Sequence, residues 1–181
     1  MQDPRVLGIV GWSGSGKTAL LIRLIPLLVQ RGLRITTLKH AHHEFDVDTA
    51  GKDSYEHRKA GASEVIISSA RRWVQMHELG NSAELSLGEL LLRVTPCDLV
   101  LIEGFKSERH PKLEVYRSAV GKSPLYPHDP RVRAVATDAP LPAPHPPHVD
   151  LNDTAAVADC VLRFAEPLPN VLQQLLPLRA S

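Results

Sequence analysis

The chain carries the glycine-rich stretch Gly11-Trp12-Ser13-Gly14-Ser15-Gly16-Lys17-Thr18, which has the phosphate-loop pattern G-x-x-x-x-G-K-[ST]. Glycines let such a loop turn its backbone amides inward toward phosphate oxygens, and the positive end of the following helix strengthens the attraction. We expect Lys17 to reach the β and γ phosphates and the Thr18 hydroxyl to bind Mg²⁺. The sequence therefore predicts that these residues bind a nucleoside triphosphate, with Lys17 as a catalytic group.

The residues on either side of this loop support the same interpretation. A short apolar run at 5–10 predicts a strand before the loop, and helical periodicity over 17–31, ended by Gly32, predicts a helix after it. Apolar runs and helical periods then alternate along the chain. We expect strands at 35–38, 65–68, 72–78, 99–102, 113–116 and 132–136, and helices at 53–60, 86–94 and 153–165.

This alternation predicts an α/β fold of the P-loop NTPase type, in which helices cover both faces of a mostly parallel sheet. The runs at 65–68 and 72–78 are expected to form an antiparallel, hairpin-like addition. We place the nucleotide-binding domain at 1–138. Residues 139–181 are expected to supply a proline-rich connector and a C-terminal helical segment that packs on the same domain.

Composition excludes several classes of function. With 21 basic and 20 acidic residues, the 181-residue chain has a net charge of +1, which gives it no general attraction for nucleic acid or an anionic membrane. Aromatic residues make up 4%, too few for a surface that stacks single-stranded bases. Cys97 and Cys160 have no metal-ligand spacing, and the first residues show no signal-peptide pattern. We therefore expect a cytoplasmic protein that binds neither nucleic acid nor membranes.

A phosphate loop requires an acidic partner at the end of a neighbouring strand, to orient the magnesium shell and the attacking water. Asp98 and Glu103 flank the apolar run at 99–102. At about 3.3 Å per residue they lie about 16 Å apart, so only one can reach the phosphates. Ligands bind at the carboxyl ends of parallel strands, which selects Glu103 as the catalytic and magnesium-associated acid.

The loop after the second predicted strand carries further polar candidates. Asp46 could contribute to the magnesium shell, usually through water. The histidines His40, His42 and His43 could bind a transition metal, although they have no companion cysteine pair and no helical i, i+4 spacing. Two basic groups could face a second, acidic ligand or only solvent: Lys52, Arg58 and Lys59, and Lys106, Lys112 and Arg117.

Base specificity has a single candidate, because the guanine signature Asn-Lys-x-Asp is absent from the sequence. Asp138 ends a late predicted strand, and a carboxylate there could accept the N1 and N2 hydrogens of guanine, which adenine does not offer. The alternative is that Asp138 only forms the turn before Pro140.

Taken in order, these segments resemble the molybdopterin-guanine dinucleotide biosynthesis protein B family from about Val6 to Asp138. The resemblance rests on the phosphate loop, Lys39-His40-x-His42-His43 with Asp46 and Asp48, Gly51-Lys52-Asp53-Ser54, Arg58 with Gly61, Leu101-Ile102-Glu103-Gly104-Phe105-Lys106, Lys112, Glu114 and Ala136-Thr137-Asp138. It implies a small homodimeric GTP-binding protein with weak GTPase activity and the cofactors GTP and Mg²⁺. It also implies a partner, the guanylyltransferase that joins GMP to molybdopterin in forming the dinucleotide molybdenum cofactor.

The same residues are also compatible with two other classes of function. A small-molecule kinase would use the same loop and Mg²⁺ to direct a γ phosphate at an acceptor hydroxyl, although no arginine-rich lid or general base stands out. A metal-delivery chaperone would use His40, His42 and His43. No arginine finger or catalytic glutamine can be assigned, which predicts slow hydrolysis.

Overall fold

The computed structural model describes residues 3–41 and 46–176, and the chain falls into two compact units. The first unit contains residues 1–40 and 87–181, and the second contains residues 41–86.

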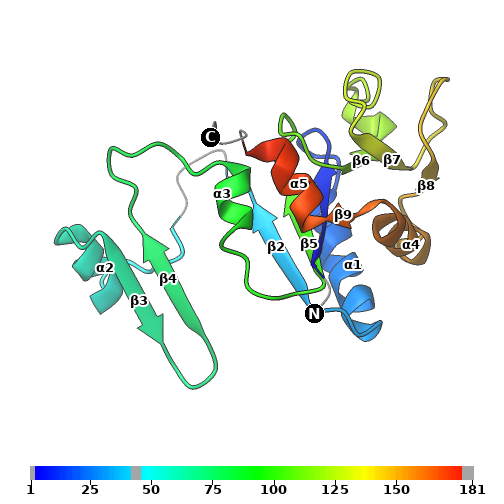
Figure 1. Cartoon of the computed structure of the whole chain (residues 1–181). Coiled ribbons are helices and arrows are strands. Elements are labelled where there is room, and N and C mark those ends of the chain that lie inside the picture. The colour runs from blue at the N-terminus through cyan, green and yellow to red at the C-terminus, as the bar shows by residue number, and fades with distance from the viewer. Residues whose placement is uncertain (1–2, 42–45, 177–181) are drawn as a thin grey trace, which may run out of the picture. The chain divides into compact units, whose positions relative to one another are not determined.

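The first unit is built on a seven-stranded sheet (Figure 1). Six parallel strands follow the order β2 (Ile35–Lys39), β5 (Leu99–Glu103), β1 (Arg5–Val10), β6 (Lys112–Tyr116), β7 (Val132–Thr137) and β8 (His148–Asp150). The short strand β9 (Glu166–Pro167) pairs antiparallel with Arg5 and Val6. It occupies the edge of β1 that β6 leaves open, since β6 pairs only with residues 8–10.

Helices cover the sheet on both faces (Figure 1). On one face α1 (Lys17–Gln30) and α4 (Thr154–Phe164) bury apolar side chains against Leu7 and Ile9 of β1. On the other face α3 (Leu87–Leu91) and α5 (Leu168–Leu175) pack against Val6. The alternating side-chain direction of a strand explains why consecutive residues of β1 contribute to different cores.

Loops rather than helices cover the β6 side of the second face. Glu114 of β6 is fully buried and accepts hydrogen bonds from the backbone amides of Leu125 (2.7 Å) and Tyr126 (2.9 Å). Burial raises the pKa of the Glu114 carboxyl, and the two amides oppose that shift. This buried carboxylate therefore anchors the segment that leads from the short helix η1 (Ser118–Val120) to β7.

Parallel strands give the sheet two chemically different edges. The carboxyl ends of β1, β2, β5, β6 and β7 lie at one edge, and the residues that follow these strands are the ones available for binding. The phosphate loop follows β1 at this edge and leads directly into α1.

The second unit consists of α2 (Asp53–Lys59) and an antiparallel hairpin of β3 (Glu64–Ser68) and β4 (Trp73–His77). Arg58 of α2 forms ion pairs with Asp46 (2.7 Å) and Glu78 (2.9 Å). These pairs connect the helix to the segment that precedes it and to the segment that follows β4.

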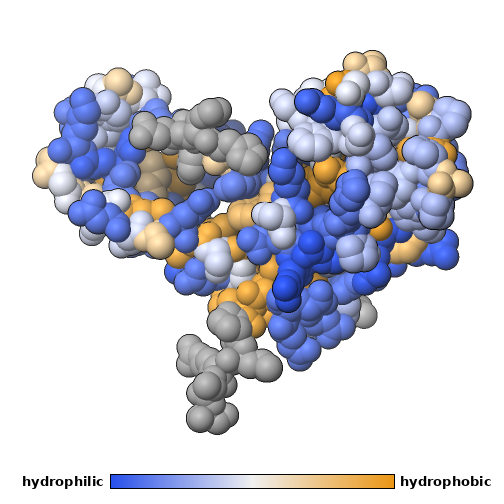
Figure 2. All heavy atoms as spheres, turned by 90° about the horizontal axis from the view of Figure 1, so that it is seen from above, coloured by the Kyte–Doolittle hydropathy of each residue, from blue (hydrophilic) through white to orange (hydrophobic). Residues whose placement is uncertain are grey.

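Hydrophilic residues cover most of the face shown in Figure 2, with hydrophobic patches between them. Several of the large apolar side chains that are exposed belong to the hairpin, namely Ile66, Ile67, Trp73 and Val74. Exposed apolar residues grouped on one hairpin are a feature of protein interaction surfaces.

The predicted α/β P-loop fold is confirmed, and the strands and helices expected from the sequence are present. The predicted antiparallel pair forms a two-stranded sheet of its own. Residues 139–176 contribute β8, α4, β9 and α5 to the unit that contains the phosphate loop. Residues 41–86, which lie within the expected domain 1–138, form a compact unit of their own.

Candidate functional site

The phosphate loop has the curled backbone that its glycines predict. Gly11, Gly14 and Gly16 have φ angles of 146°, 81° and 93°, which side-chain-bearing L residues rarely adopt. A Cβ atom on Gly11 would lie 2.5 Å from the carbonyl oxygen of Val115, so the loop also approaches β6 too closely for a side chain there. The shape of the loop therefore requires glycine at these positions.

The end of the loop is suited to an anion. Helix α1 begins after Gly16, and no side chain in the described part of the chain caps it, so its first amides are available as donors. The Ser15 hydroxyl is buried and has no hydrogen-bond partner among residues 3–41 and 46–176. These donors match the oxygens of a bound phosphate, which fits the predicted nucleotide.

Lys17 lies over the loop that precedes it. Its Nζ donates to the carbonyl oxygens of Gly11 and Trp12, each at 2.9 Å. Burial lowers the pKa of the Lys17 ammonium, Glu103 opposes that shift, and the charges of Lys106 and Lys39 add to it. The lysine is thus held at the mouth of the loop, where an added negative charge would favour its protonated form.

Thr18 and Glu103 meet across the site. The Thr18 hydroxyl donates a 2.6 Å hydrogen bond to Oε1 of Glu103, and the Nζ atom of Lys39, at the end of β2, lies 3.8 Å from Oε2. A hydroxyl and a carboxylate side by side next to a phosphate loop are oxygen ligands of the kind that Mg²⁺ prefers. Asp98 lies at the other end of β5 and accepts hydrogen bonds from the backbone amide (2.7 Å) and Nε (3.3 Å) of Arg34.

The residues after β6 and β7 close the site on another side. Arg117 donates from Nε to the carbonyl oxygen of Ser15 (3.1 Å) and from Nη1 to Oδ2 of Asp138 (3.1 Å). Oδ1 of Asp138 also accepts from the Ser118 amide at 3.4 Å. Asp138 therefore lies at the edge where it was predicted, and its carboxylate is bound to an arginine that contacts the phosphate loop.

Two aromatic contacts complete the surroundings. The indole Nε1 of Trp12 donates to the carbonyl oxygen of Ser123 (2.8 Å), and Nζ of Lys106 lies 4.6 Å from a Trp12 ring centroid. The imidazole of His40 stacks on Phe105 with ring centroids 4.6 Å apart. These contacts keep Lys106 against the phosphate loop and His40 against the segment that follows β5.

Other predicted residues take different places. The Lys112 side chain is fully buried and pairs with Oδ2 of Asp129 (2.6 Å), so it does not belong to a basic surface. Asp46 belongs to the second unit and accepts two hydrogen bonds from Arg58, and its magnesium role stays a prediction. His42 and His43 lie outside the described residues.

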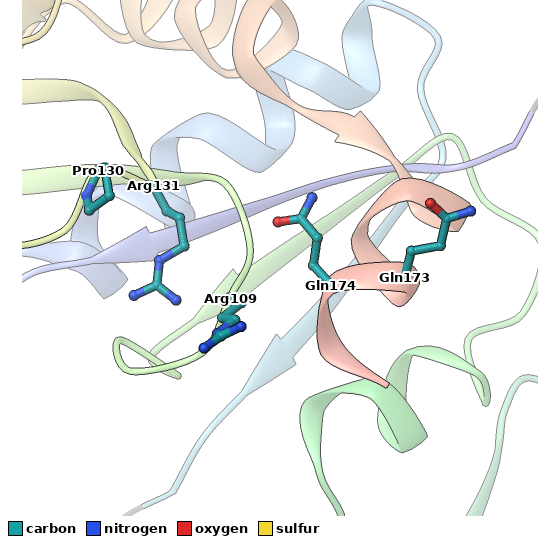
Figure 3. Close-up of a pocket in the computed structure, with 5 residues that line it drawn as sticks. All are labelled: Arg109, Pro130, Arg131, Gln173 and Gln174. Atoms are coloured by element: carbon teal, nitrogen blue, oxygen red, sulfur yellow. The ribbon is translucent and has the colours of Figure 1, made fainter. Parts of the chain in front are cut away.

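A separate groove of about 480 Å³ lies between α5 and the segments before β6 and β7 (Figure 3). It is lined by Arg109, Pro130, Arg131, Gln173 and Gln174. Arg109 and Arg131 precede the amino ends of their strands, so the groove lies at the edge of the sheet opposite to the phosphate loop. It is not part of the nucleotide site.

Residues 3–41 and 46–176 contain no helix that is long and apolar enough to cross a membrane. They also contain no group of three or more histidine, cysteine, aspartate or glutamate residues placed to hold a metal ion.

Comparison with known proteins identifies the family. The family model for MobB, molybdopterin guanine dinucleotide synthesis protein B, matches residues 6–138. The chain belongs to the MobB family. The family expected from the ordered motifs is thus confirmed.

Two relatives in the MobB family match nearly the whole chain. A molybdopterin-guanine dinucleotide biosynthesis adapter protein of Escherichia coli (strain K12) is 43% identical over 164 residues, which cover 89% of this chain and 93% of the relative. The adapter protein of Haemophilus influenzae is 42% identical over 156 residues, or 86% of each chain.

A solved structure also resembles this chain. The crystal structure of a MobB homologue from Bacillus stearothermophilus is 25% identical with a TM-score of 0.62, covering 87% of this chain and 95% of that one.

The sequence alone did not indicate the contacts that two basic residues make in this MobB-family site. In the sequence, Lys39 stands out only as part of a motif and Arg117 only as part of a basic group. Both directly follow or end parallel strands at the edge that carries the phosphate loop. That position was the available signal, and it also selected Glu103.

Proposed function

We propose that this chain is a GTP-binding adapter protein of molybdopterin-guanine dinucleotide biosynthesis, with weak GTPase activity, that assists the attachment of GMP to molybdopterin. The observation that carries the nucleotide part is the phosphate loop with its contact between Thr18 and Glu103. The adapter part is supported by the names of the relatives and by their coverage of this chain.

Each residue of the site has a role in this proposal. The amides of Gly11 to Thr18 bind the phosphates, and Lys17 contacts their β and γ oxygens. Thr18 and Glu103 would hold Mg²⁺, which would spread the negative charge of the phosphates. Glu103 would also orient the attacking water, and the sequence offers no clear catalytic glutamine to assist it, so we expect hydrolysis to be slow.

The proposed base is guanine, with Asp138 as its contact. A carboxylate has about four lone-pair positions, so the hydrogen bonds from Arg117 and Ser118 leave acceptor capacity for the N1 and N2 hydrogens of guanine. Adenine presents no such pair of donors, and a preference for GTP over ATP would follow.

The proposed partners are the guanylyltransferase with its molybdenum cofactor and a second copy of this chain. The exposed side chains of Ile66, Ile67, Trp73 and Val74 support homodimer formation, because a second copy would remove them from water.

A reconstituted reaction tests the adapter function. A molybdopterin guanylyltransferase is incubated with molybdopterin, GTP and Mg²⁺, and the dinucleotide formed is measured with and without this chain. The wild-type chain is expected to raise the yield and Lys17→Ala is expected not to. Equal yields with wild type, with Lys17→Ala and without the chain would contradict the adapter function.

A further inference from the structure

Arg117 contacts the phosphate loop from outside the sequence motif. Its Nε donates to the carbonyl oxygen of Ser15 (3.1 Å), and its guanidinium packs against Gly16, where a Cβ atom would lie 3.3 Å from Nε. The side chain reaches this position from the carboxyl end of β6, 102 residues away along the chain. Arg117 therefore stabilises the loop through a tertiary contact.

The hydrogen bond to Ser15 determines the direction of a neighbouring amide. In a trans peptide the C=O of one residue and the N–H of the next point in opposite directions within one plane. When Arg117 holds the Ser15 carbonyl, the Gly16 N–H points away from Arg117. That N–H has no hydrogen-bond partner among the described residues, and Gly16, which lacks a side chain, permits more orientations of this peptide than another residue would.

Asp138 in turn fixes the orientation of Arg117. Its Oδ2 accepts from Nη1 at 3.1 Å, so the planar guanidinium is held at two atoms, by a carboxylate at one end and by the loop carbonyl at the other. A lysine could not reproduce this, since its single ammonium group has no fork of donors.

We propose that Arg117 is a positioning residue that aims the Gly16 amide at the nucleotide phosphates, and that Asp138 supports nucleotide binding by orienting Arg117. This inference rests on the proposed nucleotide binding. It assigns Asp138 an effect on affinity that does not depend on the base, in addition to the proposed guanine contact.

Binding affinities for GTP and ITP with Mg²⁺ test the proposal, because inosine lacks the 2-amino group of guanine and differs only at the base. Arg117→Ala should weaken both nucleotides by the same factor, about tenfold, as expected for a lost phosphate hydrogen bond. Arg117→Lys should fall between wild type and Arg117→Ala. Asp138→Asn should weaken both nucleotides in the wild-type background, and this loss should be smaller in the Arg117→Ala background, where only the proposed contact with the N1 hydrogen of either base remains to be lost.

Matched measurements separate positioning from general stability. Arg133→Ala removes another arginine–carboxylate pair of the same unit, with Glu166 at 3.4 Å, and should leave both affinities unchanged. The thermal midpoint of the ligand-free protein should be similar for Arg117→Ala and Arg133→Ala. If Arg117→Ala binds both nucleotides like wild type, or if Asp138→Asn costs as much affinity without Arg117 as with it, the proposal is wrong. Failure of the wild-type chain itself to bind GTP would instead overturn the proposed function.

Discussion

The Thr18 hydroxyl donates a 2.6 Å hydrogen bond to Oε1 of Glu103 and so joins the first turn of α1 to the carboxyl end of β5. These residues are 85 positions apart in the chain, and the parallel sheet brings them together. The contact places a hydroxyl and a carboxylate beside the phosphate loop, where the proposed magnesium-dependent chemistry requires them.

Glu103→Gln tests this contact. The amide keeps the size of the side chain but removes its charge, so we expect GTP hydrolysis and magnesium dependence to fall more than GTP affinity does. Asp98→Asn, at the other end of the same strand, is the matched control and should leave both unchanged. Single-turnover hydrolysis and titration of Mg²⁺ measure the two effects. An unchanged hydrolysis rate in Glu103→Gln would assign the acid to another residue.

Gly11→Ala tests the backbone requirement of the loop. The added methyl would lie 2.5 Å from the Val115 carbonyl oxygen at a φ of 146°, so we expect lost nucleotide binding and a loss of about 2 kcal/mol or more in the free energy of unfolding. Gly14→Ala is the control, because φ there is also positive but no atom lies within 4 Å of the added carbon. Denaturant unfolding compares the two variants. Equal stability would show that the close approach to β6 is unimportant.

We expect His110 to make the free energy of unfolding depend on pH. Its imidazole is fully buried next to Gly8, and burial, together with the charges of Lys112 and Arg131, lowers its pKa to about 3. The unfolded chain takes up this proton near pH 6.5, whereas the folded chain does not. The contribution of His110 is therefore complete above pH 6.5 and decreases below it, by about 2 kcal/mol between pH 7 and pH 5.

Urea unfolding at these two pH values measures this effect in wild type, in His110→Gln and in His128→Gln, which changes an exposed histidine. The loss on acidification should be smaller in His110→Gln and unchanged in His128→Gln. Parallel behaviour of all three proteins would exclude His110 as the source.

If the chain forms a homodimer through the hairpin, substituting an exposed apolar residue of the hairpin should lower the molecular mass in solution. Trp73→Ser removes a side chain that is 63% exposed, so it should weaken the dimer without unfolding the first unit. Light scattering after size-exclusion chromatography measures the mass. Ile22→Ser, at an equally exposed apolar position of α1, is the control and should leave the dimer intact. A monomeric wild-type chain would contradict the proposal.

The sequence was sufficient to predict the strand, loop and helix of residues 5–30, because each has a strong local signal. Glu103 could be selected from the polarity of a parallel strand alone. Arg117 could not be assigned its role, since its partners Ser15 and Asp138 are distant in sequence and no local pattern connects them. The two-residue strand β9 escaped prediction because it forms only where β6 leaves β1 unpaired.

The partners of buried polar residues could not be predicted from the sequence either. Lys112 looked like a member of a basic surface, yet it is buried because Asp129 and two backbone carbonyls, those of Lys106 and Glu108, satisfy its ammonium group. Composition and spacing do not indicate such partners, because they come from loops that fold over β6.

The most direct test of the account is calorimetric titration of the chain with GTP, GDP and ATP in the presence of Mg²⁺, with Lys17→Ala as the control. The account predicts that GTP binds more tightly than ATP, and that Lys17→Ala loses this binding while its thermal midpoint stays close to that of wild type. Tighter binding of ATP, or unchanged binding of GTP to Lys17→Ala, would contradict it.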